Sequence, residues 1–353
     1  MTDRVLLLAP SRGLGGGIER YTDTLEWAFA AQGVECRRID LHRPGGGISR
    51  MSHARMLAQS RKQVRAFAAP TRLVVVHRAL LLVASLAARE RLACGISMVC
   101  HGTDVWGTRL QGRRSIEDRL MCRNDVRVVA SSSFTAGALS RFCHAAILPP
   151  GLSREWFDTL VQQPPRDNVS EPGVRLVTAF RLADWEDKGL PQLLEAVALL
   201  ARPDVHVTVC GTGEAPTALD ELVRKHDRCT LRPGLTDGEL AHQLAAADLL
   251  VLATRTRSGR HPSGEGFGLV LLEAQVAGTP VIVPAFGGSH DAYVEGVTGV
   301  APTDETPEAL ATVLQEVLQD PRRLEQMGRD AATWARESFA PERYAQLAVG
   351  RLL

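Results

Sequence analysis

The 353-residue sequence lacks several features that would define its class at once. No apolar run approaches the roughly 20 residues that a membrane-spanning helix needs. The seven cysteines are odd in number and contain no Cys-x-x-Cys pair, which argues against a disulfide framework and a structural metal site. Residues 1–5 lead directly into an apolar strand and leave no room for a signal peptide. We therefore expect a soluble, cytoplasmic protein.

Aromatic residues are also scarce, at 5% of the chain, so no stacking platform for nucleic-acid bases is evident. The net charge is only +1, but the two halves of the chain differ in sign. Residues 1–170 carry 24 basic and 14 acidic residues, a charge of +10, and the remainder carries 17 and 26, a charge of −9. Opposite signs suggest two domains with different partners. We expect no nucleic acid among them.

Short apolar runs alternate with helical patterns along almost the whole chain, which predicts parallel α/β sheets. The expected strands of the first half cover residues 5–9, 34–39, 73–76, 96–100, 126–130 and 145–148, with helices near 18–32, 50–68, 79–92, 111–123 and 133–142. A polar, proline-rich stretch at 162–173 marks a linker. The pattern restarts with strands at 174–179, 205–210, 230–232, 249–252 and 281–283, and helices near 188–201, 215–226, 236–246, 267–277 and 306–318.

These elements predict an α/β protein with two Rossmann-like parallel-sheet domains that face each other across a cleft. We place an N-terminal, acceptor-side domain at residues 1–165 and a C-terminal, nucleotide-binding domain at 166–330. The C-terminal helix at 331–353 can cross back to the first domain. In such sheets, ligands bind at the carboxyl ends of the strands. The residues that directly follow strands are therefore the candidates for function.

Four glycines within residues 13–17 follow the first strand and precede a helix. A dinucleotide-binding loop has the pattern G-x-G-x-x-G and an acidic residue about 20 residues further on. Gly13, Gly15 and Asp40 fit this pattern, but Ile18 stands in place of the third glycine. A nicotinamide or flavin site is one interpretation, but it leaves the motifs of the second half unexplained. Otherwise Asp40 is a strand-end residue, and the loop presents backbone amides to a diphosphate.

Two cations follow the first strand of the second half. Arg181 stands at the strand end and Lys188 at a helix start, where a diphosphate would also meet unpaired N–H groups. A solvated charge pair is the alternative interpretation. Gly211 and Gly213 follow the next strand, where they either allow a ligand to approach the backbone closely or form a simple turn.

The stretch SGEGFGLVLLEAQVAG carries the most specific pattern. Glu265 and Glu273 stand eight residues apart around a glycine-rich helix start. Gly266 and Gly268 leave the backbone N–H groups near Phe267–Leu269 open to an anion. Glu273, about one and a half turns into the helix, still reaches a ligand that lies across the helix start. A carboxylate accepts hydrogen bonds from two vicinal sugar hydroxyls. The alternative is that both glutamates are ordinary cap and surface acids.

Taken together, these motifs resemble the retaining glycosyltransferases of family 4, which have the GT-B fold. In the second half the resemblance rests on the E-x7-E spacing, the upstream Arg and Lys-Gly, the Gly-Thr-Gly turn and the trailing Gly-Gly-Ser. In the first half it rests on GGGIER, HGTDVW and LPPGL. Within the family, the sequence is most similar to bacterial mannosyl- and glucosyl-type transferases, including mannosyltransferases that act on phosphatidylinositol mannosides.

The resemblance implies transfer of a hexose-type sugar from a UDP- or GDP-linked donor to an acceptor hydroxyl, with retained anomeric configuration. The implied catalytic residues are Arg181 and Lys188 for the leaving diphosphate, Glu265 for the donor sugar, and His101 at the reaction centre. The donor-binding residues would be Gly16, Gly17, Gly211, Gly213, Gly266, Phe267, Gly268, Leu269 and Glu273, the last of these on the ribose. We expect no cofactor and no metal, because no Asp-x-Asp motif follows a suitable strand and two cations can replace a divalent ion.

Two other functions remain open, a sugar-nucleotide epimerase of the same fold and a catalytically silent sugar-nucleotide-binding protein. The presence of Glu265, His101 and Lys188 argues against the silent protein. Transfer of the sugar without an epimerised product would argue against the epimerase.

The acceptor side is strongly basic, with nine basic and no acidic residues between 41 and 89. Arg55, Lys62 and Arg65 share one side of the helix expected at 50–68, and apolar residues share the other. Such a helix is typical of contact with an anionic membrane or a phosphorylated acceptor. The alternative is a surface helix with its apolar side in the core. We expect an anionic or lipid-linked acceptor at the inner face of the plasma membrane, and otherwise a soluble glycan or natural product.

Overall fold

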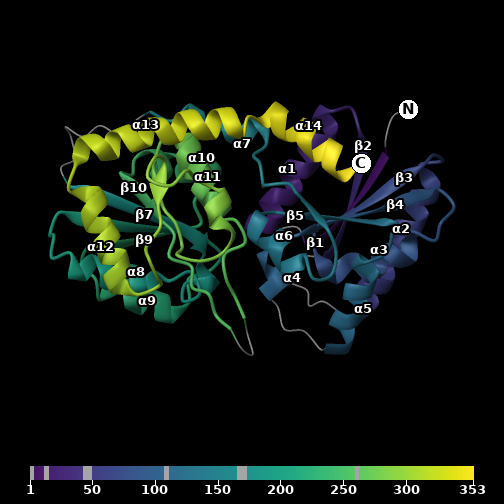
Figure 1. Ribbon diagram of the computed structural model, residues 1–353, viewed down its shortest axis with the longest axis horizontal. Helices are drawn as coiled ribbons and strands as arrows, with labels where there is room; N and C mark the ends of the chain where they lie inside the picture. Colours follow the sequence, from purple (N-terminus) through teal and green to yellow (C-terminus); the bar gives the residue numbers. More distant parts are fainter. Residues whose placement is uncertain (1–3, 12–15, 43–49, 107–110, 165–172, 259–261) are drawn as a thin grey trace. The chain divides into compact units, whose positions relative to one another are not determined.

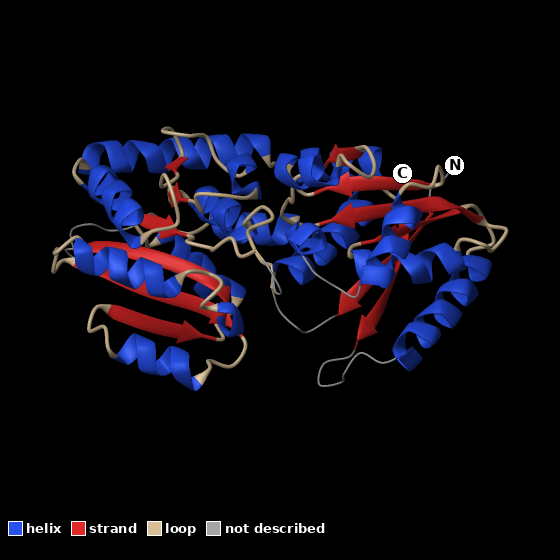
Figure 2. Ribbon diagram, turned by 60° about the horizontal axis from the view of Figure 1, so that its bottom comes forward, coloured by secondary structure: helices blue, strands red, loops and turns tan. Residues whose placement is uncertain are grey.

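The computed structural model describes residues 4–11, 16–42, 50–106, 111–164, 173–258 and 262–353. The chain divides into two compact units, each with one six-stranded parallel sheet flanked by helices (Figures 1 and 2). The first unit comprises Met1–Ser153, Gly259–Pro262 and Pro341–Leu353, and the second comprises Arg154–Ser258 and Ser263–Ala340. This arrangement confirms the predicted α/β class with two parallel sheets.

The sheet of the first unit has the strand order β2-β1-β3-β4-β5-β6. Its strands are β1 (Arg4–Ser11), β2 (Glu35–His42), β3 (Thr71–Val75), β4 (Ala93–Cys100), β5 (Val126–Ala130) and β6 (Ala145–Ile147). The connecting helices are α1 (Gly17–Ala31), α2 (Arg50–Ala66), η1 (Arg78–Leu80), α3 (Leu81–Ala87), α4 (Gly102–Trp106), α5 (Gln111–Met121) and α6 (Ser133–Leu139). Because the order changes direction between β1 and β3, the carboxyl ends of these strands form a switch point.

Both faces of this sheet are covered, which explains its continuous apolar strands. Along β1, Leu6 and Leu8 join one core cluster, whereas Val5 and Leu7 join the other. The second cluster includes Tyr344 of α14 (Pro341–Leu352), the C-terminal helix that packs beside α1 in Figure 1. The Pro-Pro-Gly turn lies against this helix, and a Cβ on Gly151 would meet the Tyr344 ring at 2.3 Å. Close packing therefore requires glycine in the turn.

The sheet of the second unit has the order β12-β11-β10-β7-β8-β9. Its strands are β7 (Val174–Arg181), β8 (Val205–Thr212), β9 (Cys229–Pro233), β10 (Leu249–Val251), β11 (Val281–Ile282) and β12 (Gly299–Val300). Its helices are α7 (Arg154–Val161), η2 (Leu182–Asp184), α8 (Leu190–Leu199), α9 (Thr217–Arg224), α10 (Asp237–Ala245), α11 (Leu269–Ala277), η3 (Gly288–Asp291), α12 (Pro307–Leu318) and α13 (Pro321–Ser338). Counted from β7, this is the Rossmann order, with its switch point between β7 and β10.

The predicted strands are all present, and the differences concern short elements. β12, with two residues, is too short to show a pattern, and the helix expected at 79–92 is split into η1 and α3 and ends at Ala87. α7 was not predicted, and it belongs to the second unit although it precedes the expected boundary at residue 165. Most of the linker expected at 162–173 lies outside the described residues.

Helix α2 buries its apolar side in the core of the first unit. Met56, Val64 and Phe67 are buried there, and Leu57 is partly buried against them. The guanidinium of Arg65 donates two hydrogen bonds of 2.8 Å to the carboxylate of Glu90. The apolar side is therefore occupied by the protein itself, as the surface-helix interpretation requires. Among the described helices, none combines the length and hydropathy needed to cross a bilayer.

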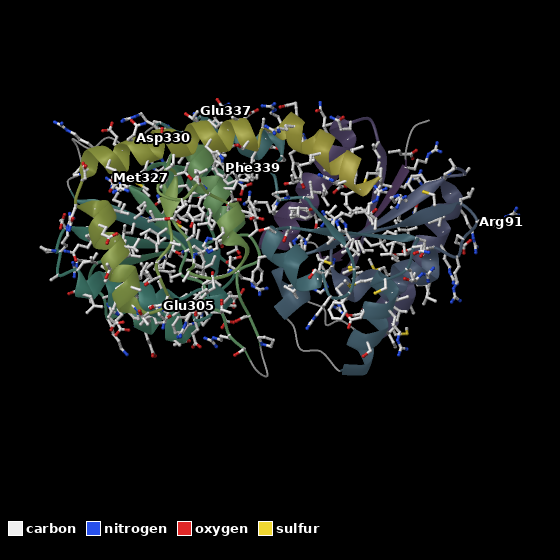
Figure 3. All side chains as sticks on the ribbon, viewed as in Figure 1. Arg91, Glu305, Met327, Asp330, Glu337 and Phe339 are labelled. Atoms are coloured by element: carbon white, nitrogen blue, oxygen red, sulfur yellow. The ribbon has the colours of Figure 1, made fainter. Side chains whose placement is uncertain are left out.

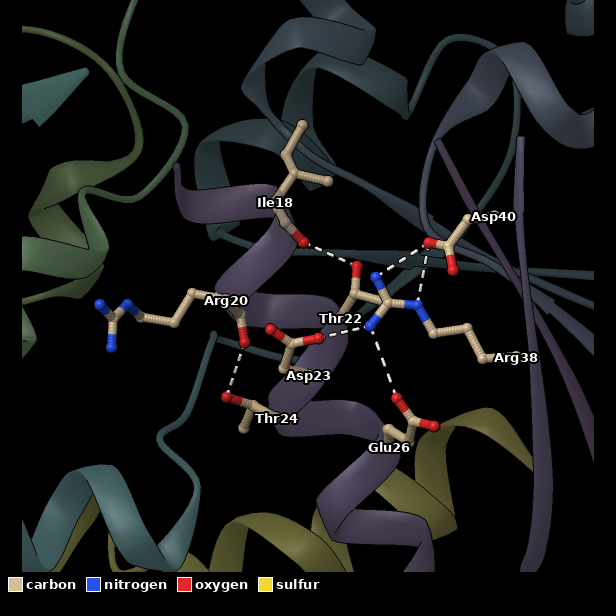
Figure 4. A network of polar contacts seen from close by, with 8 residues as sticks. All are labelled: Ile18, Arg20, Thr22, Asp23, Thr24, Glu26, Arg38 and Asp40. Atoms are coloured by element: carbon tan, nitrogen blue, oxygen red, sulfur yellow. Dashed lines mark hydrogen bonds and ion pairs between the residues drawn. The ribbon is translucent and has the colours of Figure 1, made fainter. Parts of the chain in front are cut away.

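Asp40 lies at the end of β2, where its carboxylate is paired (Figure 4). The buried guanidinium of Arg38 donates to Asp40 Oδ1 at 3.0 Å and also contacts Asp23 and Glu26 of α1. Asp40 thus serves an ion-pair network that joins β2 to α1. This placement agrees with a strand-end residue rather than with a ribose ligand of a dinucleotide site.

Candidate functional site

The switch point of the second sheet holds a compact polar cluster. Lys188, which follows β7, donates from Nζ to Glu265 Oε2 at 2.8 Å. The hydroxyl of Thr254, which follows β10, donates to the same carboxylate oxygen at 2.8 Å. The structure thus brings together two of the predicted site residues, 77 positions apart in the chain. Thr254 was missed, although its place just after the strand expected at 249–252 was a signal for it.

Glu265 is an ionised carboxylate in a buried position. Glu265 as a whole residue is 8% exposed, and the side chain of Lys188 is 25% exposed. Burial acts to raise the pKa of Glu265, but the charge and hydrogen bond of Lys188, with the hydroxyl of Thr254, lower this pKa on balance. The cluster therefore holds a buried carboxylate beside the partly exposed ammonium group of Lys188.

Glycines fix the loops that carry this ion pair. Gly189 has φ +70°, and a Cβ there would lie 1.9 Å from the carbonyl oxygen of Ala253. This close approach holds Lys188 next to the carboxyl end of β10. Gly287 has φ +113°, and a Cβ on it would lie 2.6 Å from the carbonyl oxygen of Glu265. The backbone amide of the next residue, Gly288, donates a hydrogen bond to that oxygen at 2.9 Å. The Gly-Gly pair after β11 therefore positions the loop of Glu265.

The glycine-rich start of α11 has the backbone geometry that the sequence suggested. Gly268 is left-handed, with φ +82°, and a Cβ on it would meet the side chain of Leu271 at 2.7 Å. Leu269 is the first helical residue, so the amides near it have no partner within the helix. Phe267 is buried against Phe339, labelled in Figure 3 at the end of α13, with ring centroids 6.3 Å apart. The side chain of Phe267 thus packs, and only its backbone is a candidate ligand.

Glu273 lies in the middle of α11 and is only 4% exposed. Its Oε1 accepts a hydrogen bond of 2.9 Å from the indole nitrogen of Trp156, a residue of α7. A surface acid would not be placed in this way. The partnership joins positions 117 residues apart. No sequence signal linked Trp156 to the site.

Arg181 is paired with a carboxylate of its own. At the end of β7 its Nε and Nη2 donate to the two oxygens of Asp184 at 2.9 and 3.0 Å. The Arg181 side chain is 46% exposed, so water screens this pair far more than it screens Lys188 and Glu265. An anion that binds Arg181 must compete with Asp184.

Gly211 and Gly213 differ in what surrounds them, since β8 continues to Thr212 and Gly211 lies within the strand. A Cβ on Gly211 would lie 2.4 Å from the carbonyl oxygen of Phe180 and from the side chain of Leu182. Close packing of η2 therefore requires glycine at 211. Gly213 has φ +86° and open space around it, and Gly266 is partly exposed. Their contact with a donor stays a prediction.

His101 follows β4 in the first unit, where Asp104 holds its backbone. Asp104 accepts from the amide of His101 at 2.7 Å and from the amide of Arg78 at 2.9 Å. Within the described residues, the buried His101 Nε2 has no hydrogen-bond partner. The ring meets Tyr21 edge-on, 4.8 Å between centroids. Burial lowers the pKa of His101 to about 4, against the opposing charge of Asp104, so the imidazole is neutral at pH 7.

The glycine loop of the first unit is described only at its end. Gly16 has φ +103°, precedes α1, and is exposed like Gly17, with nothing within 4 Å of a Cβ built on either. Gly13 and Gly15 lie outside the described residues. The described start of α1 thus leaves room for a ligand.

Comparison with known proteins matches the second unit to a family. Residues 174–334 match the model "Glycosyl transferases group 1". The chain is 28% identical over 280 residues to the GDP-mannose-dependent alpha-(1-6)-phosphatidylinositol monomannoside mannosyltransferase of Mycolicibacterium smegmatis. The matched region covers 75% of this chain and 72% of that protein. Several other curated relatives are longer, and the chain spans about half of their length.

Solved structures share the fold over almost the whole chain. Sucrose-phosphate synthase from Thermosynechococcus elongatus superposes with a TM-score of 0.78 at 19% identity, covering 99% of this chain and 98% of that one. Anabaena HepE in complex with UDP-glucose superposes with a TM-score of 0.73 at 17% identity, covering 98% of both chains. The chain therefore has the GT-B fold that these structures share, and its residues 174–334 are similar to the glycosyl transferases group 1 family.

Proposed function

We propose that this protein transfers a hexose-type sugar from a nucleoside diphosphate sugar to an acceptor hydroxyl, with retention and without a metal. The observation that carries the proposal is the buried ion pair of Lys188 and Glu265 at the switch point of the second sheet. Ligands bind at such points in open α/β sheets. The pair also lies within the segment that matches the glycosyltransferase family.

Charge develops on the diphosphate as its bond to the sugar breaks. Lys188, Arg181 and the amides at the start of α11 would stabilise this charge, and such stabilisation accelerates the reaction when it is stronger in the transition state. Two cations of this kind make a divalent metal unnecessary. Glu265, ionised beside Lys188, would accept hydrogen bonds from the donor sugar.

Retention follows if both bonds to the anomeric carbon lie on one face of the sugar. The bond to the diphosphate oxygen breaks, the bond to the acceptor oxygen forms, and the acceptor proton passes to the leaving phosphate. No protein nucleophile is needed in this step. Glu273 would hold the ribose, and the neutral imidazole of His101 would contact the sugar with its unpartnered Nε2.

The comparisons support a UDP- or GDP-linked donor. The mycobacterial relative is named as GDP-mannose-dependent, and HepE was solved with UDP-glucose. We further propose an anionic or lipid-linked acceptor at the inner face of the plasma membrane. The exposed side chains of Arg55 and Lys62 on α2 support this through charge alone, since the apolar side of the helix is buried.

A thermal-shift panel tests the donor site. The protein is heated with UDP, GDP, ADP or dTDP, each with and without its sugar, once in EDTA and once with magnesium or manganese. A nucleotide at 100 times its dissociation constant stabilises the folded state by about 2.7 kcal/mol. We expect UDP or GDP to raise the melting temperature in EDTA. A shift that requires magnesium or manganese would contradict metal independence, and no shift with any nucleotide would contradict the function.

A further inference from the structure

The indole of Trp156, a residue of α7, donates a hydrogen bond to the carboxylate of Glu273 in α11. α7 begins at Arg154, the first residue of the second unit, and packs against α10 and α11. Its indole is 5% exposed, and Nε1 lies 2.9 Å from Oε1 of Glu273. The contact is therefore a hydrogen bond between two buried side chains.

This contact restricts the orientation of the Glu273 carboxylate. A glutamate has three rotatable side-chain bonds, and its terminal torsion is broad, so the helix alone does not fix the plane of the carboxylate. An indole N–H can only donate, so it always meets an acceptor oxygen. Burial of both groups makes the alternative, a carboxylate without this donor, costly. Trp156 thus restricts which way Glu273 presents its Oε1 atom.

We propose that Trp156 is a positioning residue for ribose recognition. It holds Glu273 in the rotamer that accepts hydrogen bonds from the two vicinal hydroxyls of a nucleotide ribose. This inference rests on the proposed function, because it assigns Trp156 to the same nucleotide site. It goes beyond that function because it makes ribose selectivity depend on α7, the helix with which the second unit begins.

Calorimetry with matched nucleotides tests the assignment. Dissociation constants are measured in EDTA for GDP and 2′-deoxy-GDP and for UDP and 2′-deoxy-UDP. We expect the wild type to favour the ribose form of its nucleotide by about tenfold, the scale of a hydrogen bond to a charged group. Trp156→Phe, which keeps an aromatic ring but removes the donor, reduces this preference towards one. Phe157→Leu, a change at a buried neighbour on the same helix, keeps it.

The outcomes separate the two proposals. If Trp156→Phe retains the ribose preference of the wild type, the positioning role is wrong and the proposed function stands. If neither GDP nor UDP binds the wild type, the proposed function fails and the inference fails with it. A preference lost equally in Trp156→Phe and Phe157→Leu would show a general packing effect and overturn the positioning role.

A second measurement does not depend on the folding of Trp156→Phe. In protein labelled with ¹⁵N at tryptophan, the indole N–H signal of Trp156 reports its hydrogen bond without any nucleotide. We expect Glu273→Gln, which keeps the shape but removes the charge, to shift the signal of one tryptophan strongly. Trp334, which packs on Phe339 with ring centroids 5.4 Å apart, provides the unshifted control. No shift of any indole signal would overturn the inference.

Discussion

Lys188→Met should destabilise the second unit in a manner that depends on pH. The substitution keeps most of the side-chain volume but leaves the buried Glu265 without its cation. Removal of one partner from a fully buried ion pair costs about 3–5 kcal/mol. Because Lys188 is 25% exposed, water can replace part of the lost interaction, and we expect a smaller cost than this range, about 2–3 kcal/mol at pH 7.

The sign of the pH dependence follows from the pKa of Glu265. In the wild type this pKa is lowered, so its stabilising contribution is present above the unfolded value and is lost as pH falls. In Lys188→Met, burial is opposed only by the hydrogen bonds from Thr254 and Gly266, so it raises the pKa of Glu265 and the ionised form destabilises the protein at neutral pH. Protonation near the ordinary pKa of glutamate, about 4.3, should relieve this cost. The difference between wild type and variant therefore shrinks from pH 7 towards pH 4.5.

Hydrogen exchange of amides in β7 and α11 measures this effect, because a chain of two compact units need not unfold in one step. Lys188→Met/Glu265→Gln is the matched control and should be more stable at pH 7 than Lys188→Met alone. Equal destabilisation at pH 7 and pH 4.5, or no recovery in the double variant, would refute the view that a buried ionised carboxylate dominates this site.

Three further predictions concern binding and turnover. Asp184→Asn should strengthen nucleoside diphosphate binding up to about fivefold, because it releases a half-exposed Arg181, and unchanged calorimetric affinity would contradict this competition. Glu273→Ala should weaken binding of the bare nucleotide, whereas Glu265→Gln should spare it and reduce transfer; equal weakening in calorimetry would show that these roles are wrongly divided. Arg55→Glu/Lys62→Glu should abolish co-sedimentation with anionic vesicles at low salt, and a wild type that ignores such vesicles would indicate a soluble acceptor.

The fold was predictable because the central strands of the first sheet are buried on both faces and the other strands alternate regularly with helical patterns. Continuous apolar runs such as Val5–Ala9 are unambiguous when bounded by turns and separated by helical patterns. β12 could not be found because two residues carry no periodicity. Helix α7 was missed because it has only eight residues, too few for a sustained helical pattern, although Ser153 directly precedes it as a candidate N-cap.

The site was predictable as a set of residues but not as a set of contacts. Lys188 was found by its place after a strand, and Glu265 by its place beside a glycine-rich helix start. Their pairing depends on how the switch point folds. The contact of Trp156 with Glu273 could not be predicted either, since no local pattern relates two helices that lie far apart in the sequence. For Gly211, the sequence could not show why glycine is needed. A glycine near the end of a strand looks the same in sequence whether close packing or a ligand requires it.

The most direct test of the account is the rate of sugar transfer from GDP-mannose and UDP-glucose in EDTA, followed by release of the nucleoside diphosphate and by mass of the product. We expect the wild type to turn over one of these donors, and Glu265→Gln to lose about 100-fold or more, the scale of one transition-state hydrogen-bonding group. Asp204→Asn, which breaks an exposed ion pair with Arg202, should match the wild type. An active wild type whose rate Glu265→Gln leaves unchanged would contradict the assignment of the buried Lys188–Glu265 pair to the reaction.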